Sequence, residues 1–524
     1  MPEGSSKPPT RAACSQPGEI IMRNKTMKAK VLIATVCIAA FASGVCAQQG
    51  GTAGQNPTST KGAVVKGKAP VNKNLLTVKL PKEQEGTLKN GLHVILLESN
   101  HMLPIFSMEM VVMSGGFSDP ADMRGLANMT ALLMREGTAK HNSRELGEAL
   151  DTIGATFGAN SGVSSFTSNI TASGLTDNLD QILDLYAEII RTPKYPTEEV
   201  ERYKSRTLDS QPQLRANPGF LAQERLAQAI YGTHPASLTF APPDAIKKIT
   251  AADLMRFHDQ NYVPNNATLY IAGDVTLKQM LPKLEQLFGD WKQGDVKQPT
   301  LPPVPTQAET KIHLINRPGS VQTVFQIGSL SLERTSPDYV AMRVMNQILG
   351  TGPPSRLFLN IREDKGYTYS VGSTFNAGKY PGLFIAQSPV RTDVTEGTIR
   401  EFMNEFKRIR DEKVTVTELD NAKHAIIGNF ALSLENPTGR LNNIIQQRMY
   451  GLPANYWDTY PQKVQAITAE DVQRVAQKYV DINHMQIVAV GDASKTREVL
   501  AKFGSVQEYD GDGKPVRTAS AGGQ

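Results

Sequence analysis

The chain contains 524 residues, a length that predicts roughly two to four domains. Hydrophobic residues make up 40% of it and charged residues 20%, so the composition supports buried cores and excludes a disordered or collagen-like protein. The 56 lysines and arginines outnumber the 51 acidic residues, and there are three cysteines, so the meaning of both counts depends on where these residues lie.

The first 47 residues are predicted to be an export signal. A basic stretch at 23–30 precedes a short apolar run at 31–42, and a cleavage pattern of small residues ends at Ala47. The apolar run has about a dozen residues, fewer than the ~20 that a membrane-spanning helix needs. The alternative is that the apolar run is an uncleaved anchor or a buried helix. Met22 or Met27 is the natural start of translation, in which case the residues before it are a mis-assigned extension.

Loss of this leader changes both counts. The leader holds all three cysteines, six basic residues and two acidic ones, so 477 residues remain with 50 basic and 49 acidic side chains, a net charge of +1. We therefore expect no nucleic-acid partner, no disulfide and no thiolate metal site in the mature protein. We expect it in the periplasm, free or attached to the outer membrane, with no membrane span after signal cleavage.

Beyond the leader, the hydrophobic patterns predict mixed strands and helices. The segment 48–78 is rich in Gly, Thr and Lys, which is typical of a flexible tether. β-Branched and large apolar residues predict strands at 92–97 and 106–113. Apolar residues at helical spacing predict helices at 125–136 and 179–190. Strand pairs followed by helices indicate an α+β fold.

The chain repeats itself once at a long interval, which predicts two homologous domains. Ile249–Asp253 recurs as Ile467–Asp471 at an offset of 218, with Thr and Asp in the same places. At an offset of 219, Glu199, Asn217-Pro218 and Tyr231-Gly232 recur as Glu418, Asn436-Pro437 and Tyr450-Gly451. A repeat this long is a domain duplication, since solenoid periods are about 20–50 residues.

The expected domain boundaries follow from this repeat and from composition. They are a signal peptide at 1–47, a tether at 48–78, a first domain at 79–295, a Pro-rich linker at 296–309, a second domain at 310–507 and a disordered tail at 508–524.

Three motifs in the first domain resemble the opening of the pitrilysin/insulinase family, which includes the mitochondrial processing peptidases. They are Asn90–Val94 (NGLHV), Ser114–Pro120 (SGGFSDP) and Gly125–Ala127 (GLA). The similarity extends over about 78–506. It implies a duplicated metallopeptidase fold, in which each domain is a mostly antiparallel sheet with helices packed on it and the two domains form a half-clamshell.

The zinc motif of the family is absent from this sequence. Active members carry H-x-x-E-H on the helix after GLA, because two imidazoles one turn apart bind zinc and the carboxylate between them is the general base. Here Asn128 and Leu132 occupy the histidine positions, and Ala131 occupies that of the base. The distal ligand position falls at Asp209, or at Ser210 in a register shifted by one. We predict no catalytic residue, metal or cofactor in this chain.

The histidines offer no replacement site by spacing. They are His93, His101, His141, His234, His258, His313, His424 and His484, and no two lie three to five residues apart. His141 and Glu145 form the one local pair at helical spacing, which we interpret as a solvated pair at a helix end.

The second domain retains a different element of the family. The segment Ser355–Phe358 leads to Arg362, which lies seven residues before Tyr369. This resembles the Arg/Tyr element that, in active members, reaches the zinc site of the facing domain and donates hydrogen bonds to the peptide and its developing oxyanion. The alternative is an Arg and a Tyr satisfied locally.

These features together predict a non-catalytic subunit that completes the activity of a two-subunit periplasmic zinc metallopeptidase. A homologous partner would supply the zinc, this chain would supply Arg362 and Tyr369, and the substrates would be unstructured peptides. A catalytically silent scaffold or peptide-binding protein of the same fold is the alternative. A third hypothesis, hydrolysis through an unrecognised site of its own, is opposed by the histidine spacing.

Overall fold

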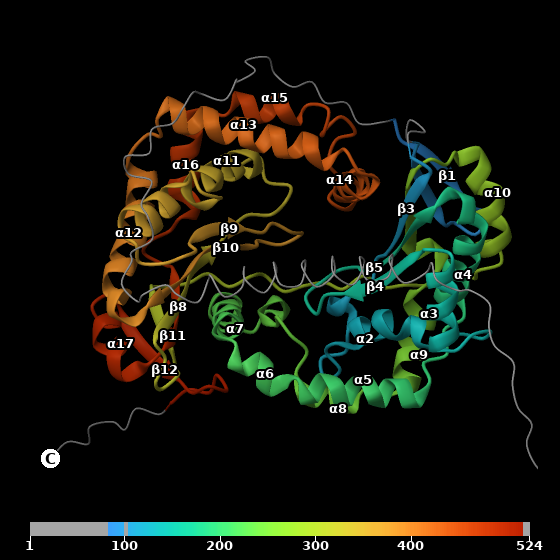
Figure 1. Cartoon of the computed structure of the whole chain (residues 1–524), viewed down its shortest axis with the longest axis horizontal. Coiled ribbons are helices and arrows are strands. Elements are labelled where there is room, and N and C mark those ends of the chain that lie inside the picture. The colour runs from blue at the N-terminus through green and yellow to red at the C-terminus, as the bar shows by residue number, and fades with distance from the viewer. Residues whose placement is uncertain (1–81, 99–102, 517–524) are drawn as a thin grey trace, which may run out of the picture. The chain divides into compact units, whose positions relative to one another are not determined.

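The computed structural model describes residues 82–98 and 103–516, so the predicted signal peptide and tether lie outside the described residues. The described strands form two six-stranded sheets, one from each half of the chain (Figure 1). The first contains β1 (Gln84–Thr87), β2 (His93–Glu98), β3 (Ile105–Val112), β4 (Thr156–Ser161), β5 (Ser168–Leu175) and β6 (Ala267–Gly273). The second contains β7 (Lys311–Asn316), β8 (Gln322–Leu330), β9 (Gly372–Phe375), β10 (Leu383–Arg391), β11 (Gln486–Gly491) and β12 (Ser505–Tyr509).

Both sheets are mixed, with antiparallel pairs in the majority. The strand order is β1-β2-β6-β3-β5-β4 in the first sheet and β12-β7-β11-β8-β10-β9 in the second. In the first sheet β2 runs parallel to β6, and in the second β7 runs parallel to β11 and β12, whereas all other neighbours are antiparallel. The predicted α+β class is confirmed.

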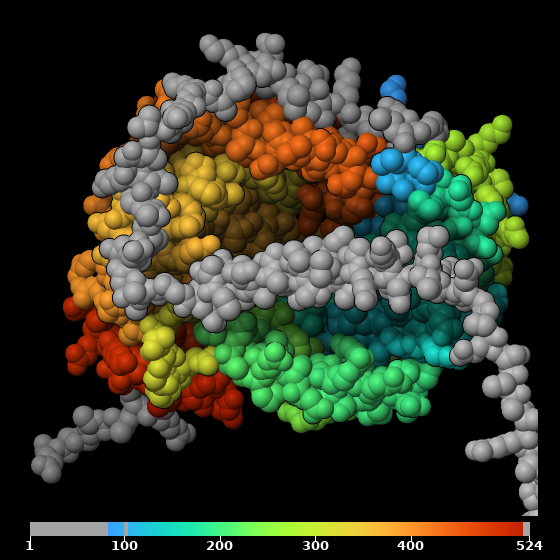
Figure 2. All heavy atoms as spheres, viewed as in Figure 1, coloured from blue at the N-terminus to red at the C-terminus, as the bar shows by residue number. Residues whose placement is uncertain are grey.

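Helices cover both sheets. The first half contains α2 (Leu126–Leu133), α3 (Ser143–Thr152), α4 (Leu179–Arg191), α5 (Thr197–Asp209), α6 (Gln211–Ala216), α7 (Pro218–Tyr231), α8 (Pro243–Lys248), α9 (Ala251–Asn261) and α10 (Leu277–Phe288). The second contains α11 (Tyr339–Gly350), a π-helix (Phe358–Asp364), α12 (Thr395–Asp411), α13 (Val416–Ser433), α14 (Pro437–Met449), α15 (Tyr460–Ala466), α16 (Ala469–Tyr479) and α17 (Ala493–Leu500). Short 3₁₀ turns span Gly116–Ser118, Met134–Glu136, Thr176–Asn178, Pro235–Ser237, Pro264–Asn266 and Thr392–Val394. Figure 2 shows α5 and α6 along the surface, where Val200 is the single buried side chain of the two helices.

The four elements expected near the start of the first domain occur within one or two residues of the predicted bounds, except that the helix at 125–136 ends in a 3₁₀ turn after Leu133. The duplication is visible in the helix ends. Helices α9 and α16 begin at equivalent places of the repeat, each with a capping box in which a threonine and the aspartate three residues later bond each other's backbone N–H. Helices α7 and α14 are equivalent in the same way, and each follows an asparagine cap and has proline in its first turn.

Each half of the chain contributes one helix that packs on the sheet of the other half. Helix α7, from the first half, packs on β8 and β11 of the second sheet, in a cluster that contains Leu226, Ile230 and Val488. Helix α14, from the second half, packs on β3 and β6 of the first sheet through Leu441 and Ile444. The sheet face away from each domain's own core is therefore covered by a helix of the other half.

The segment between the two sheets lacks regular secondary structure, whereas the last described residues of the chain include a strand. Residues 291–308 contain no helix or strand, whereas the boundary predicted at 507 falls inside β12. The tail was predicted to begin too early, because Tyr509 stacks under the guanidinium of Arg225, which also donates a hydrogen bond to the Gly513 carbonyl. Within residues 82–98 and 103–516, no helix has both the length and the apolar character to cross a membrane.

Candidate functional site

Helix α2 carries the three positions where the zinc motif of active relatives would lie. Ala131 is fully buried in the core, so its methyl group packs where a carboxylate would need solvent or metal. Asn128 is half-buried, and its amide nitrogen donates to the Ser161 carbonyl on β4. Tyr203 of α5 lies near the amide oxygen of Asn128, with its hydroxyl 3.5 Å away. The side chain at the first ligand position therefore forms a structural hydrogen bond.

Leu132, at the second histidine position, differs from Ala131 in its burial. The Leu132 side chain is 36% exposed, whereas Ala131 is fully buried. The exposure follows from helical geometry, because Asn128 and Leu132 lie one turn apart on the same face, which is not the face that enters the core. An apolar side chain now lies on the face where active relatives present an imidazole.

The start of α2 is fixed by an acidic residue that sequence analysis did not single out. The Asp119 carboxylate accepts hydrogen bonds from the backbone N–H groups of Gly125 at 2.7 Å and Ala127 at 2.8 Å. Burial raises the pKa of Asp119 to about 7, against the opposing effect of these two donors. Gly125 has a φ of 104°, a left-handed conformation that glycine adopts without strain. The SGGFSDP motif that contains Asp119 therefore positions α2.

The distal position does not complete a metal site. Asp209, at the end of α5, is exposed and accepts a hydrogen bond from Ser205 at 3.1 Å, while Ser210 donates to the Thr207 carbonyl at 2.8 Å. In the part of the chain that the structure describes, no group of three or more His, Cys, Asp or Glu side chains could bind a metal ion. An amide, a methyl group and an isobutyl group do not fit zinc, so the family's metal is not assigned to this chain.

His141 has a different partner from the one predicted. Its Nδ1 lies 2.8 Å from the carboxylate of Glu188 on α4, whereas Glu145 forms the capping box of α3 with Asn142. Glu188 is far from His141 in the sequence, so local spacing could not reveal the pair. Glu188 also accepts a hydrogen bond from Thr138, and the pair joins the β-bridged loop before α3 to α4.

Arg362 and Tyr369, predicted from the second domain, do lie together. The Arg362 guanidinium carbon is 4.7 Å from the centre of the Tyr369 ring and 4.6 Å from that of Phe358. Glu363 is 3.7 Å from Nε of Arg362. Tyr369 is 82% exposed, so its side chain is open to solvent. Phe358, which completes the stack, was noted only as part of the preceding motif.

An ion pair between a buried arginine and a half-buried glutamate anchors the segment that presents Arg362. Arg356 lies two residues before the π-helix, and its side chain is 5% exposed. It binds the Glu418 carboxylate through Nε at 2.7 Å and Nη2 at 3.1 Å, a bidentate geometry that fixes direction as well as distance. Glu418 also completes the capping box of α13 with Thr415. The π-helix turn that places Arg362 beside Phe358 therefore starts from a rigid point.

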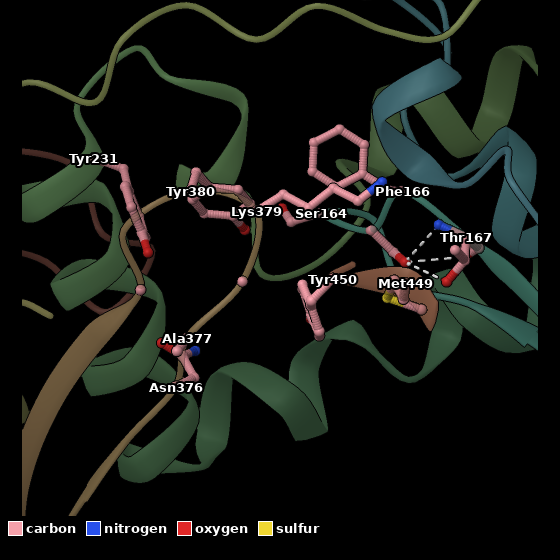
Figure 3. A pocket seen from close by; sticks show the side chains of 13 residues that line it. Ser164, Phe166, Thr167, Tyr231, Asn376, Ala377, Lys379, Tyr380, Met449 and Tyr450 are labelled. Atoms are coloured by element: carbon pink, nitrogen blue, oxygen red, sulfur yellow. Dashed lines mark hydrogen bonds between the residues drawn. The ribbon is translucent and has the colours of Figure 1, made fainter. Parts of the chain in front are cut away.

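A pocket of about 190 Å³ lies where the two halves meet. Its walls come from the loop 164–167, the loop 376–382, Tyr231 at the end of α7, and Met449 with Tyr450 at the end of α14. Figure 3 shows Tyr231 beside Tyr380, and their ring centres are 6.0 Å apart. Because Tyr231 and Tyr450 are equivalent positions of the internal repeat, both copies of the repeat contribute to this pocket.

The fold and the substituted motif define a metallopeptidase-type protein, and comparison with known families gives its class. Residues 94–244 match the family described as "Insulinase (Peptidase family M16)", and residues 248–426 match "Peptidase M16 inactive domain". Together the two matches cover more than half of the chain. The protein belongs to peptidase family M16, as the sequence resemblance implied.

Relatives of similar size support this assignment. "Non-peptidase homolog YmxG" of Helicobacter pylori is 22% identical over 405 residues, which cover 77% of this chain and 93% of the relative. A solved structure described as a peptidase M16 inactive domain from Pseudomonas fluorescens has a TM-score of 0.73 and 27% identity, covering 78% of this chain and 98% of its own. A protease from Helicobacter pylori has the same fold, with a TM-score of 0.73 at 20% identity over 79% of this chain and all of its own.

Proposed function

We propose that the chain is the non-catalytic subunit of a two-subunit zinc metallopeptidase. A homologous partner with an intact H-x-x-E-H motif supplies the zinc, and this chain supplies Arg362 and Tyr369 to bind the peptide and stabilise the transition state. The observation that carries the proposal is the stack of half-buried Arg362 on exposed Tyr369, in a chain whose zinc-motif positions are Asn128, Ala131 and Leu132.

The chemistry of the pair suits this role. A guanidinium donates hydrogen bonds in a fixed plane, and a phenol donates one more, so together they match the carbonyl of a peptide and the oxyanion that it becomes. Stacking of Arg362 between Phe358 and Tyr369 restricts its rotamers before substrate arrives. Donors ordered in advance lose less entropy when the transition state forms.

The substrates in this proposal are unstructured peptides, because an extended backbone exposes the carbonyl groups that the pair would contact. The location is the periplasm, which rests on the leader at 1–47 and is tested by cell fractionation. The proposal also predicts that the purified chain binds no zinc of its own, and that a complex with the partner contains one zinc ion, measured by elemental analysis.

The deciding experiment is co-expression with a secreted M16 homologue of the same organism that retains H-x-x-E-H, followed by assay of the purified complex on an unstructured peptide. Arg362→Ala and Tyr369→Phe should lower kcat at least tenfold while the complex still forms. Tyr367→Phe is the matched control, since this nearby tyrosine packs beside Gly397 of α12 rather than beside Arg362.

Three results would contradict the proposal. Unchanged cleavage in both variants would remove the role of the Arg–Tyr pair. A homologue equally active without this chain would indicate a scaffold or peptide-binding protein, the alternative of the same fold. Cleavage by this chain alone, with stoichiometric zinc, would show that it has a site of its own.

A further inference from the structure

Among the described residues, Arg334 is a buried cation without an acidic partner. It lies between β8 and α11, is 3% exposed, and its backbone N–H donates to the Gly378 carbonyl at 2.9 Å. One guanidinium nitrogen donates to the Tyr456 hydroxyl at 3.2 Å, whereas Nε and the other terminal nitrogen, both buried, have no hydrogen-bond partner among the described residues. A native protein seldom leaves such donors unpaired, so this group calls for an explanation.

Aromatic rings surround this guanidinium. Its central carbon is 3.9 Å from the ring centre of Tyr339 and 5.0 Å from that of Tyr456, with Trp457 at 5.8 Å. The faces of these rings attract a cation, which offsets part of the cost of burying it. They do not neutralise it, so Arg334 keeps its positive charge beneath the rings.

Two further cations contact the same pair of tyrosines. The ammonium group of Lys463 on α15 is 4.3 Å from the centre of the Tyr456 ring. Burial alone would lower the pKa of Arg343 on α11, but the nearby phenol groups of Tyr460 and Tyr339 raise it. Arg343 is exposed and Lys463 half-buried, so solutes can reach both. Burial, followed by repulsion from Arg334, lowers the pKa of Lys463. Within the described residues, none of the three cations forms an ion pair with a carboxylate.

We infer that this group of five residues (Arg334, Arg343, Lys463, Tyr339 and Tyr456), the Arg334 cluster, binds a carboxylate of a peptide. Arg343 and Lys463 would contact the carboxylate directly, and Arg334 would attract it from beneath the rings. That the ligand is a peptide rests on the proposed function, whereas its negative charge follows from the cluster alone. The chain would therefore favour peptides rich in Asp and Glu.

The test measures binding to the purified chain without any partner, so it does not depend on cleavage. By isothermal titration calorimetry at low ionic strength, a blocked Gly/Ser peptide with three glutamates should bind at least tenfold more tightly than the same peptide with three glutamines. Added salt should reduce this preference, because accessible charges are screened. Trp457, one of two tryptophans in the chain, gives a fluorescence readout beside Arg334.

Arg343→Met and Lys463→Met, separately and together, should remove the preference for glutamate. They are chosen over Arg334→Met because a buried substitution can prevent folding. Lys407→Met, an exposed lysine on α12, is the matched control and should bind as the wild-type chain does. Circular dichroism should show that every variant remains folded.

Equal affinity for the two peptides, or binding of neither, would overturn the inference. So would wild-type binding by the Arg343 and Lys463 double variant. Inorganic phosphate is the second probe, and saturation by phosphate with no effect of the glutamate peptide would replace the carboxylate site with a phosphate site. Failure of the Arg362 experiment alone would refute the proposed subunit function and leave the preference for acidic peptides standing.

Discussion

The ion pair between Arg356 and Glu418 gives the sharpest stability prediction, because the internal repeat supplies its own control. In Glu418→Gln, the Arg356 guanidinium, 5% exposed, would lose its counter-charge. Burial alone would raise the pKa of Glu418, but hydrogen bonds from Arg356 and Thr415 outweigh it and lower the pKa to about 2 from an ordinary value of 4.5. This difference corresponds to about 3 kcal/mol at neutral pH.

The equivalent residue of the first half is Glu199, on the first turn of α5. Its partner there is Arg202, whose side chain is 51% exposed. An exposed pair of this kind contributes about 0.5 kcal/mol or less. Glu199→Gln should therefore be nearly neutral, although it makes the same chemical change at the same point of the repeat.

Denaturant unfolding followed by circular dichroism measures both variants against the wild type at several pH values. A lowered pKa in the folded state contributes stability above the unfolded pKa, and this contribution is lost as the pH falls through the folded value. The deficit of Glu418→Gln should thus be about 3 kcal/mol at pH 7 and shrink between pH 4.5 and pH 2. Equal deficits for Glu199→Gln and Glu418→Gln, or a deficit that does not shrink in acid, would refute the reasoning.

Three further outcomes are expected. Ala131→Glu should lower the free energy of unfolding by at least about 2 kcal/mol, because it buries a charge. Leu132→Ser, on the exposed face, should change the free energy of unfolding by less than about 0.5 kcal/mol. The denaturant midpoints of the two variants check both values. Burial alone would raise the pKa of Asp338, but hydrogen bonds from a lysine, an arginine and a tyrosine of α16 lower it to about 2. Asp338→Asn should therefore cost about 1 to 2 kcal/mol at pH 7, a loss that fades as the pH falls from about 4 to 2 and that the same unfolding measurement follows. Tyr369→Phe should leave the melting temperature within about 1 °C of wild type, since an exposed hydroxyl contributes little to folding, and a larger drop would mean that the pair serves stability.

Sequence patterns predicted those parts of the fold that depend on local physics. Strands and helices follow from residue spacing within one element, which is why the strand predicted at 92–97 and the helix predicted at 179–190 occur within one residue of these bounds. The family resemblance located the zinc-motif positions Asn128, Ala131 and Leu132, because active members carry the motif on the helix that follows GLA. Exposure of Leu132 was not predicted, because it depends on which face of α2 meets the core.

Long-range pairings could not be predicted in this way. The partner of His141 is Glu188 on another helix, and nothing in the spacing of either residue indicates it. The Arg334 cluster draws on residues more than 100 positions apart, and in the sequence each of its three cations looks like an ordinary surface residue. Arg362 and Tyr369 were found only because a family resemblance supplied their relation, which the seven-residue spacing alone does not.

The exchange of α7 and α14 has a consequence for how this protein is made. Synthesis proceeds from the first residue onward, so the strands of the first sheet, which end with β6 at Gly273, leave the ribosome well before α14, which begins at Pro437. At common rates of translation this leaves one apolar face bare for on the order of ten to thirty seconds. A nascent chain with this apolar face exposed is prone to aggregate. The first half therefore completes its folding only after the second half has been synthesised. A gene cut between the halves would yield two products that each need the other to remain soluble.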